Sequence, residues 1–174
     1  MFIEVYRDFI PTNKIISDNV SEHWRAHANK MKYHGNRMRN ILDGSISMPE
    51  FTLPEKEEVN KIAMQGKPFL IYIEFWKFQD ITYDHFNYTT TLKAQIDVLT
   101  SIGFWPDDNW KFVGTGMVGG GGASEWSKRA IRYDGDNLPD ELTSEWWKEH
   151  APINSTFARM FASDIQPSDI KNIL

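Results

Sequence analysis

The chain has 174 residues, enough for one domain that buries roughly two-thirds of its unfolded surface. Its 41% hydrophobic and 25% charged residues are typical of a packed globular protein and argue against overall disorder. The sequence contains no Cys, which excludes disulfides and thiolate metal sites and suits a reducing cytoplasm. No stretch approaches the roughly 18 apolar residues of a membrane span, so we expect a cytoplasmic protein without a membrane partner.

The net charge of −5 argues against nucleic-acid binding over the whole surface, because affinity for phosphate comes from Lys and Arg. The charge is unevenly distributed, however. Between residues 19 and 40 there are five basic residues and one acid, a local charge of +4, while acids gather in 50–58 and 134–149. The basic segment is therefore the part of the chain suited to a polyanion.

The first half of the chain predicts a strand and two helices. Residues 2–10 alternate with period two and stop at Pro11, which predicts the first strand. A helix is predicted from Ser21, and Gly35 is expected to weaken or split it. Residues 54–65 predict a short acidic helix that ends at Gly66.

The helix after Ser21 has two distinct faces. Apolar residues expected to face the core recur near helical spacing at Trp24, Ala28, Met31, Met38 and Leu42. Polar and basic residues share another face at Arg25, Lys32, Asn36 and Arg39. That basic face is either a DNA-binding surface or an ordinary solvated helix face.

The second half begins with residues 69–78, whose nearly continuous apolar character predicts a central strand. A helix over 90–103 follows, with Gly103 as its stop and Phe104 as the apolar contact after it. Residues 110–118 and 128–135 predict two strands joined by a hairpin that contains four consecutive glycines. A phosphate-binding loop is disfavoured there, because the run lacks the Gly-Lys-Ser/Thr ending and no helix follows.

The C-terminal part predicts helices over 139–150 and 154–162, and Pro167 can open another. The whole chain therefore predicts a single α+β domain, residues 1–174, with a small mixed β-sheet packed against helices. Residues 138–174 are expected to be a helical C-terminal extension of that domain.

Two pairs of acids stand where a metal site can form. Asp80 and Asp84 follow the predicted central strand, and Asp107 and Asp108 follow the next helix. Oxygen ligands of this kind suit Mg²⁺ or Mn²⁺. A helix of about 15 residues spans roughly 20 Å, so the two pairs meet only if the chain after Asp108 returns toward the first loop.

Lys93 lies on the helix between these acids. A cation there can neutralise negative charge that develops on a phosphate during cleavage. Lys93 and Asp97 are also four residues apart, so an ordinary ion pair along one helix face is the structural alternative.

The segment TLKAQIDVLTSIGFWPDDNWKFV, residues 91–113, resembles the signature region of the RusA-like Holliday junction resolvases. In that family a K-A-x-x-D-A-L helix leads through a G-F/V-x-x-D-D turn into a strand. The matching residues are Lys93, Ala94, Asp97, Leu99, Gly103, Phe104, Asp107 and Asp108. The loop around residues 9–19 and the strand around 69–78 resemble the family more weakly.

One family motif, D-x-D-N-x-x-K, is incomplete here. Asp84 takes the place of its first acid and Asn87 that of its Asn, but Phe86 stands at the second acid. Three extra residues then separate Asn87 from Lys93. One metal-binding carboxylate of the family is therefore absent from its usual position.

The resemblance implies a Mg²⁺-dependent endonuclease that acts as a homodimer on four-way DNA junctions, encoded by a phage or prophage and working in the bacterial host cytoplasm. Under it, Asp84, Asp107 and Asp108 are metal-binding acids, and Lys93 is catalytic together with Asp84 and Asp108. The residues expected to contact DNA are Arg25, Lys32, Arg39, Lys128 and Arg129.

Two other functions are compatible with the same residues. The absent acid and the net charge of −5 favour a catalytically degenerate DNA-binding or phage-associated module with the same fold. A carbohydrate-binding module is suggested only by seven Trp, which core packing explains as well.

Overall fold

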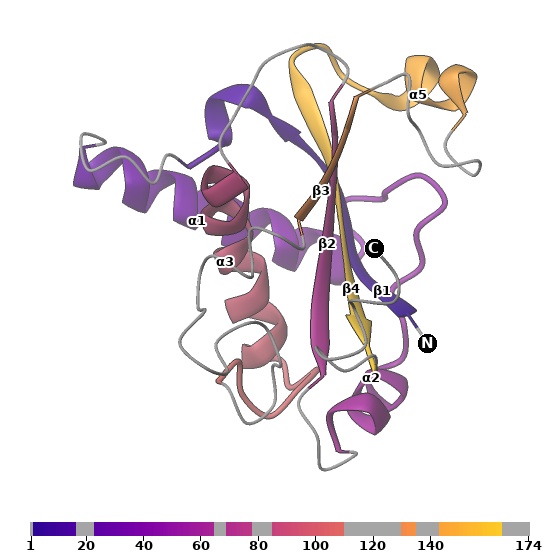
Figure 1. Cartoon of the computed structure of the whole chain (residues 1–174). Helices are drawn as coiled ribbons and strands as arrows, with labels where there is room; N and C mark the ends of the chain where they lie inside the picture. The colour runs from indigo at the N-terminus through magenta and orange to yellow at the C-terminus, as the bar shows by residue number, and fades with distance from the viewer. Residues whose placement is uncertain are drawn as a thin grey trace.

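A computed structural model of the chain describes residues 2–16, 23–64, 69–77, 85–109, 130–134 and 143–164 (Figure 1). In chain order the elements are β1 (Phe2–Pro11), a 3-10 turn (Thr12–Lys14), α1 (Trp24–Leu42), α2 (Lys56–Ala63), β2 (Leu70–Lys77), α3 (His85–Ser101), β3 (Ala130–Asp134), α5 (Ser144–His150) and β4 (Ser155–Ser163). In the described part of the chain, no helix is long and apolar enough to cross a membrane.

The strands form one four-stranded sheet in the order β1-β4-β2-β3. β4 runs antiparallel to both β1 and β2, whereas β3 runs parallel to β2. The sheet is therefore mixed, and helices α1 and α3 pack together beside it (Figure 1). This confirms the α+β prediction and the inner position of the strand over residues 70–77.

The predicted helix over residues 154–162 is wrong, because these residues form strand β4. Phe157 is paired with Phe9 of β1 on one side and with Trp76 of β2 on the other. Eight of its nine residues are buried. A strand covered on both faces shows no period-two alternation, so its apolar pattern cannot be told from that of a buried helix.

The C-terminal extension is therefore not wholly helical, and β4 is an internal strand of the sheet. A helix is confirmed at Ser144–His150, within the predicted span of 139–150. The remaining C-terminal prediction, a helix near Pro167, lies outside the described residues, as do the first strand (110–118) and the glycine loop of the predicted hairpin. Of its predicted second strand, 128–135, residues Ala130–Asp134 form β3, which pairs with β2.

Helix α1 runs unbroken through Gly35, so that of the two expected effects, a weakened or a split helix, the split does not occur. A Cβ atom at Gly35 would lie 4.0 Å from Val98 Cγ2 of α3 and 3.4 Å from Arg39 Nη1. The glycine thus lies where α1 and α3 pack together, and tertiary packing outweighs its low helix propensity.

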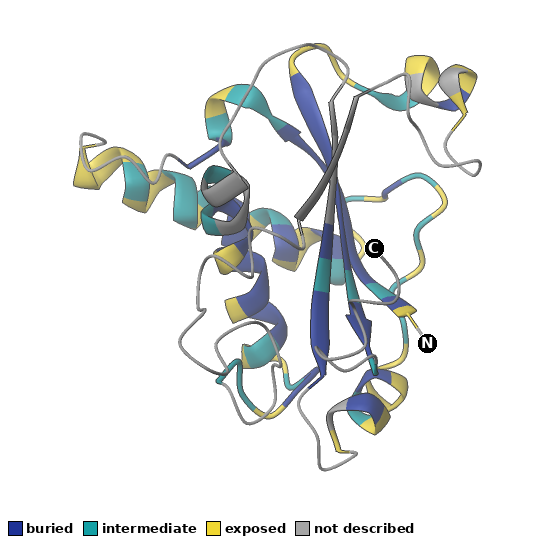
Figure 2. Cartoon of the chain, in the orientation of Figure 1, coloured by how far each residue is buried: buried dark blue, intermediate teal, exposed yellow. Residues whose placement is uncertain are grey.

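The N-terminal turns of α1 lie beyond the sheet and are exposed, whereas its C-terminal half is buried against the body (Figure 2). Met38 is in the core, as the apolar spacing predicts, and Leu42 is partly buried against it, whereas Ala28 is exposed. Trp24 was expected to be in the core as well, but 68% of its surface is exposed. Helical periodicity identifies an apolar face without showing how far along the helix that face is covered.

Candidate functional site

Lys93 of α3 lies between two carboxylates at the surface. Its Nζ donates to Asp97 Oδ1 at 2.5 Å and to Asp108 Oδ2 at 2.5 Å. About half of the Lys93 and Asp97 side chains and 29% of the Asp108 side chain are exposed. The predicted Lys93–Asp97 pair is confirmed, and Asp108, a predicted metal ligand, joins it across the turn.

The charges of this cluster reinforce each other. Partial burial lowers the pKa of Lys93, but hydrogen bonds to Asp108 and Asp97 outweigh it, so that this pKa lies above its ordinary value. The hydrogen bond from Lys93 is the main reason that the pKa of Asp108 is lowered, against partial burial. At neutral pH the ammonium and the Asp108 carboxylate are therefore both charged.

Asp108 is positioned by a helix ending of the Schellman type. The Phe104 N–H donates to the Leu99 carbonyl and the Gly103 N–H to the Thr100 carbonyl, each at 3.0 Å. Gly103 has φ of +76°, a left-handed conformation that favours glycine. The predicted stop at Gly103 and the apolar contact of Phe104, which is buried, are both present.

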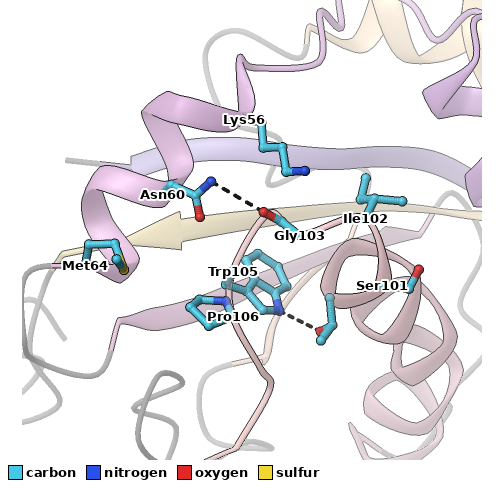
Figure 3. Close-up of a pocket in the computed structure, with 9 residues that line it drawn as sticks. Lys56, Asn60, Met64, Ser101, Ile102, Gly103, Trp105 and Pro106 are labelled. Atoms are coloured by element: carbon cyan, nitrogen blue, oxygen red, sulfur yellow. Dashed lines mark hydrogen bonds between the residues drawn. The ribbon is translucent and has the colours of Figure 1, made fainter.

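The turn is anchored to its surroundings by Trp105, which is 1% exposed. The Trp105 indole donates to Thr100 Oγ1 at 2.8 Å, and its ring lies 5.1 Å from that of Phe69. From α2, the Asn60 amide donates to the Gly103 carbonyl at 3.4 Å (Figure 3). Asp107 and Asp108 therefore follow directly after a buried and hydrogen-bonded turn.

A surface pocket of about 640 Å³ lies between α2 and this turn (Figure 3). Lys56 and Asn60 line it from α2, and Trp105 and Pro106 line it from the turn. Sequence reasoning missed it, because no local pattern indicates that two segments more than 40 residues apart form one hollow.

Asp107 stabilises the same turn with its carboxylate. Its Oδ1 accepts from the Asp108 N–H at 2.8 Å, and its Oδ2 accepts from Asn109 Nδ2 at 2.5 Å. Each carboxylate oxygen has more than one acceptor position, so these bonds leave room for a cation. Asp107 thus has a structural role that the sequence prediction did not include.

The described residues contain no group of three His, Cys, Asp or Glu side chains that could hold a metal ion. They do hold the adjacent carboxylates of Asp107 and Asp108. Mg²⁺ binds through one or two carboxylates together with waters and substrate phosphate, so this pair is compatible with Mg²⁺. Asp84, the third predicted ligand and a predicted catalytic residue, lies outside the described residues.

The three α1 residues predicted to contact DNA, Arg25, Lys32 and Arg39, are all exposed. Arg37 of the same helix instead points inward and pairs with the buried Asp8. Lys128 and Arg129, the other two predicted DNA contacts, lie outside the described part of the chain.

Asp8 is the centre of a buried polar network that sequence reasoning missed. Its carboxylate accepts from Arg37 Nε at 2.6 Å and Nη2 at 2.7 Å, and from the Phe9 N–H at 2.8 Å. The Tyr6 hydroxyl donates to it at 3.2 Å and also lies 3.2 Å from the Gln95 amide of α3. Burial raises the pKa of Tyr6, which keeps this hydroxyl protonated as a donor. The network joins β1 to α1 and α3.

No family model, curated protein or solved structure matches this chain. What the Lys93 cluster can do is therefore inferred from its own residues and from the motif resemblance of residues 91–113.

Proposed function

We propose that this protein is a Mg²⁺-dependent endonuclease of the RusA-like type, which cleaves Holliday junctions or other branched DNA by phosphodiester hydrolysis. The observation that carries the proposal is the position of Lys93, whose ammonium contacts both Asp97 and Asp108 at the surface. These residues occupy the positions at which the sequence resembles the resolvase signature.

Lys93 has the chemistry that cleavage of a phosphodiester requires. An ammonium at the surface can bind a non-bridging phosphate oxygen and neutralise charge that develops in the transition state. Its carboxylate neighbours keep it protonated and hold its long side chain in place. In the free protein, Asp108 and Asp97 accept hydrogen bonds from the Lys93 ammonium. A bound DNA phosphate would share this ammonium with them.

Asp107 and Asp108, together with Asp84, are the residues that would hold Mg²⁺. A bound ion would supply activation of a water and stabilisation of the leaving oxygen. The protein's own contribution is positional, since the Gly103 turn places Asp108 against Lys93, with Asp107 as the preceding residue of the chain.

The exposed basic residues Arg25, Lys32 and Arg39 support a DNA substrate. They provide local positive charge on a protein whose net charge is −5, so binding is expected on one face and not over the whole surface. A homodimer in the bacterial host cytoplasm belongs to the same proposal, because two equivalent sites suit a junction cut on two strands.

The direct test is to incubate the purified protein with a labelled synthetic four-way junction and Mg²⁺ or Mn²⁺. We expect cleavage of the junction, with rate losses of about 100-fold or more for Lys93→Met and Asp108→Asn. Both variants should still bind the junction. The exposed acid Glu57 of α2 offers a matched control, and Glu57→Gln should cleave like the wild type. Binding without any cleavage by the wild type would rule the enzyme out.

A second candidate is a DNA-binding module of the same fold without nuclease activity. Phe86 at a motif acid position favours it, as do the hydrogen bonds that engage both oxygens of Asp107 in the turn. This function predicts junction binding that weakens steeply with salt and a melting temperature that Mg²⁺ does not change. A rise in melting temperature with Mg²⁺ that Asp108→Asn abolishes would contradict it.

A further inference from the structure

Trp24, at the start of α1, differs from the other tryptophans whose side chains the structure describes. Its side chain is 68% exposed, whereas Trp105 is 1% and Trp146 is 8% exposed. An indole that is open to solvent on this scale offers a flat aromatic face on which a base or another ring can stack. Because α1 extends beyond the sheet here (Figures 1 and 2), the indole stands at the end of a projecting helix.

The immediate neighbours of Trp24 are aromatic and basic. The His23 ring is stacked on the indole with centroids 5.9 Å apart and an interplanar angle of 25°. The Arg25 guanidinium lies 5.2 Å from the indole centroid, in a cation–π position. These contacts orient the indole while most of its surface stays open to solvent.

Basic residues continue from this point along the exposed face of the helix. Arg25, Lys32 and Arg39 follow at intervals of seven residues, two turns of helix, so that they form a row about 20 Å long. An aromatic platform next to a row of positive charge is the combination with which proteins bind unpaired nucleotides: the base stacks and the backbone follows the charge.

We propose that Trp24 is a stacking platform for an unpaired base of branched DNA, with Arg25, Lys32 and Arg39 along the adjoining backbone. This inference rests on the proposed function, since it assumes a DNA ligand, and it adds the selection of unpaired bases over intact duplex. Trp24 is a binding residue and takes no part in bond cleavage.

The test measures binding without Mg²⁺, in EDTA, so that cleavage does not enter. Fluorescence anisotropy would compare a four-way junction carrying unpaired bases at its centre with a fully paired duplex of equal length. We expect Trp24→Leu, which keeps apolar bulk but has no aromatic face, to weaken junction binding about tenfold or more and duplex binding much less. Trp24→Phe should stay within about threefold of the wild type.

Two further measurements separate stacking from other roles. A 2-aminopurine at an unpaired position should be quenched by the wild type and by Trp24→Phe, but not by Trp24→Leu. Ile153→Ala, which truncates another highly exposed apolar residue (85%), should leave both affinities unchanged. Circular dichroism of Trp24→Leu should match the wild type, because an exposed side chain adds little to the core.

Three results would overturn the platform: wild-type junction affinity in Trp24→Leu, equal weakening on junction and duplex, or a changed oligomeric state of Trp24→Leu in sedimentation. The last result would assign the indole to a contact between two copies of the chain. The proposed function fails in a different way, namely by the absence of cleavage with Mg²⁺ while Trp24-dependent junction binding persists.

Discussion

Two ion pairs of this protein illustrate what burial does to a charge. Arg37 and Asp8 have side chains that are 25% and 1% exposed, whereas Lys93 and Asp108 are 50% and 29% exposed. An exposed pair contributes little because water solvates both partners well when they are apart. A buried charge that loses its partner cannot recover that solvation. We therefore assign a stabilising role to the first pair and expect the second, on which the proposed function rests, to contribute little to stability.

Substitution of one partner in each pair tests this assignment. Arg37→Met should lower the free energy of unfolding by about 3 kcal/mol, because Asp8 would remain buried without its main partner. Lys93→Met should lower it by less than about 1 kcal/mol. Urea unfolding at neutral pH measures both values. Equal losses in the two variants would contradict the division of roles.

His34 predicts a pH dependence of stability. It is 1% exposed, and its Nε2 lies 2.8 Å from the Lys14 carbonyl. Burial lowers the pKa of His34, although the Lys14 carbonyl and Asp8 act to raise it and Lys14 and Arg37 add to the lowering. Below the ordinary histidine value of 6.5, the unfolded chain therefore binds a proton that the folded protein does not. This contribution to stability is present above pH 6.5 and is lost as the pH falls.

Unfolding measured at about pH 7.5 and about pH 5.5, on either side of the ordinary histidine pKa, checks that sign. In the wild type the free energy of unfolding should be lower at the acidic pH than at the neutral pH. The difference should be smaller in His34→Gln, which lacks the titrating imidazole. Asn29→Gln, at an exposed position of the same helix, removes no titratable group, so it is the matched control and should keep the wild-type slope. An unchanged slope in His34→Gln would mean that other groups cause the pH effect.

At the scale of elements, the ending of α3 links local conformation to the site. The left-handed Gly103, the buried Trp105 and the Asn60 contact from α2 together decide where Asp107 and Asp108 emerge. The carboxylates themselves contribute little to this arrangement apart from the hydrogen bonds of Asp107. The turn and its contact with α2 therefore determine where Asp107 and Asp108 lie.

Gly103→Ala and Gly44→Ala form a matched pair that tests this. Both glycines have positive φ, +76° and +80°, so each alanine should cost about 1 kcal/mol in backbone conformation. A Cβ at Gly103 would come within 3.1 Å of the Lys56 Nζ and Cε, whereas nothing lies within 4 Å at Gly44.

Because the end of a lysine side chain can move, the extra cost in stability at Gly103 should be small. We expect Gly103→Ala to reduce junction cleavage about tenfold or more by displacing the acids, since small misplacements of catalytic groups are costly. Gly44→Ala should cleave normally despite a similar loss of stability. Equal activities of the two variants would show that the turn geometry is not critical.

At the scale of the whole molecule, β4 joins strands from distant parts of the chain into one sheet. It lies between β1, from the N-terminus, and β2, from the middle of the chain. The sheet is therefore complete only when the C-terminal strand is in place. Contacts between residues so distant in sequence are the kind that no local pattern predicts.

Hydrogen exchange offers a test of this central role. Amides of β4 that pair with β1 and β2 should exchange only through global unfolding, and so be among the slowest in the protein. Amides of the short helix α5 should exchange by local opening, several orders of magnitude faster. Fast exchange throughout Ser155–Ser163 would contradict the inner position of the strand.

Most elements of this fold can be predicted from sequence because they have local causes. The spacing of apolar residues indicates α1 and α3, Gly103 ends α3, and β1 and β2 are rich in strand-forming residues. The same local reasoning pairs Lys93 with Asp97, since residues four apart share a helix face. The sequence by itself therefore indicates Lys93 and its neighbouring acids as a candidate site.

Only the tertiary structure decided the features that depend on distant partners. It made 155–163 an inner strand and not a helix, brought Asp108 against Lys93, and paired Asp8 with Arg37 inside the core. It also left Trp24 exposed, since whether an apolar helix face is covered depends on how far the neighbouring sheet extends. Periodicity reports the preference of a segment for burial, but burial itself requires another part of the chain to be there.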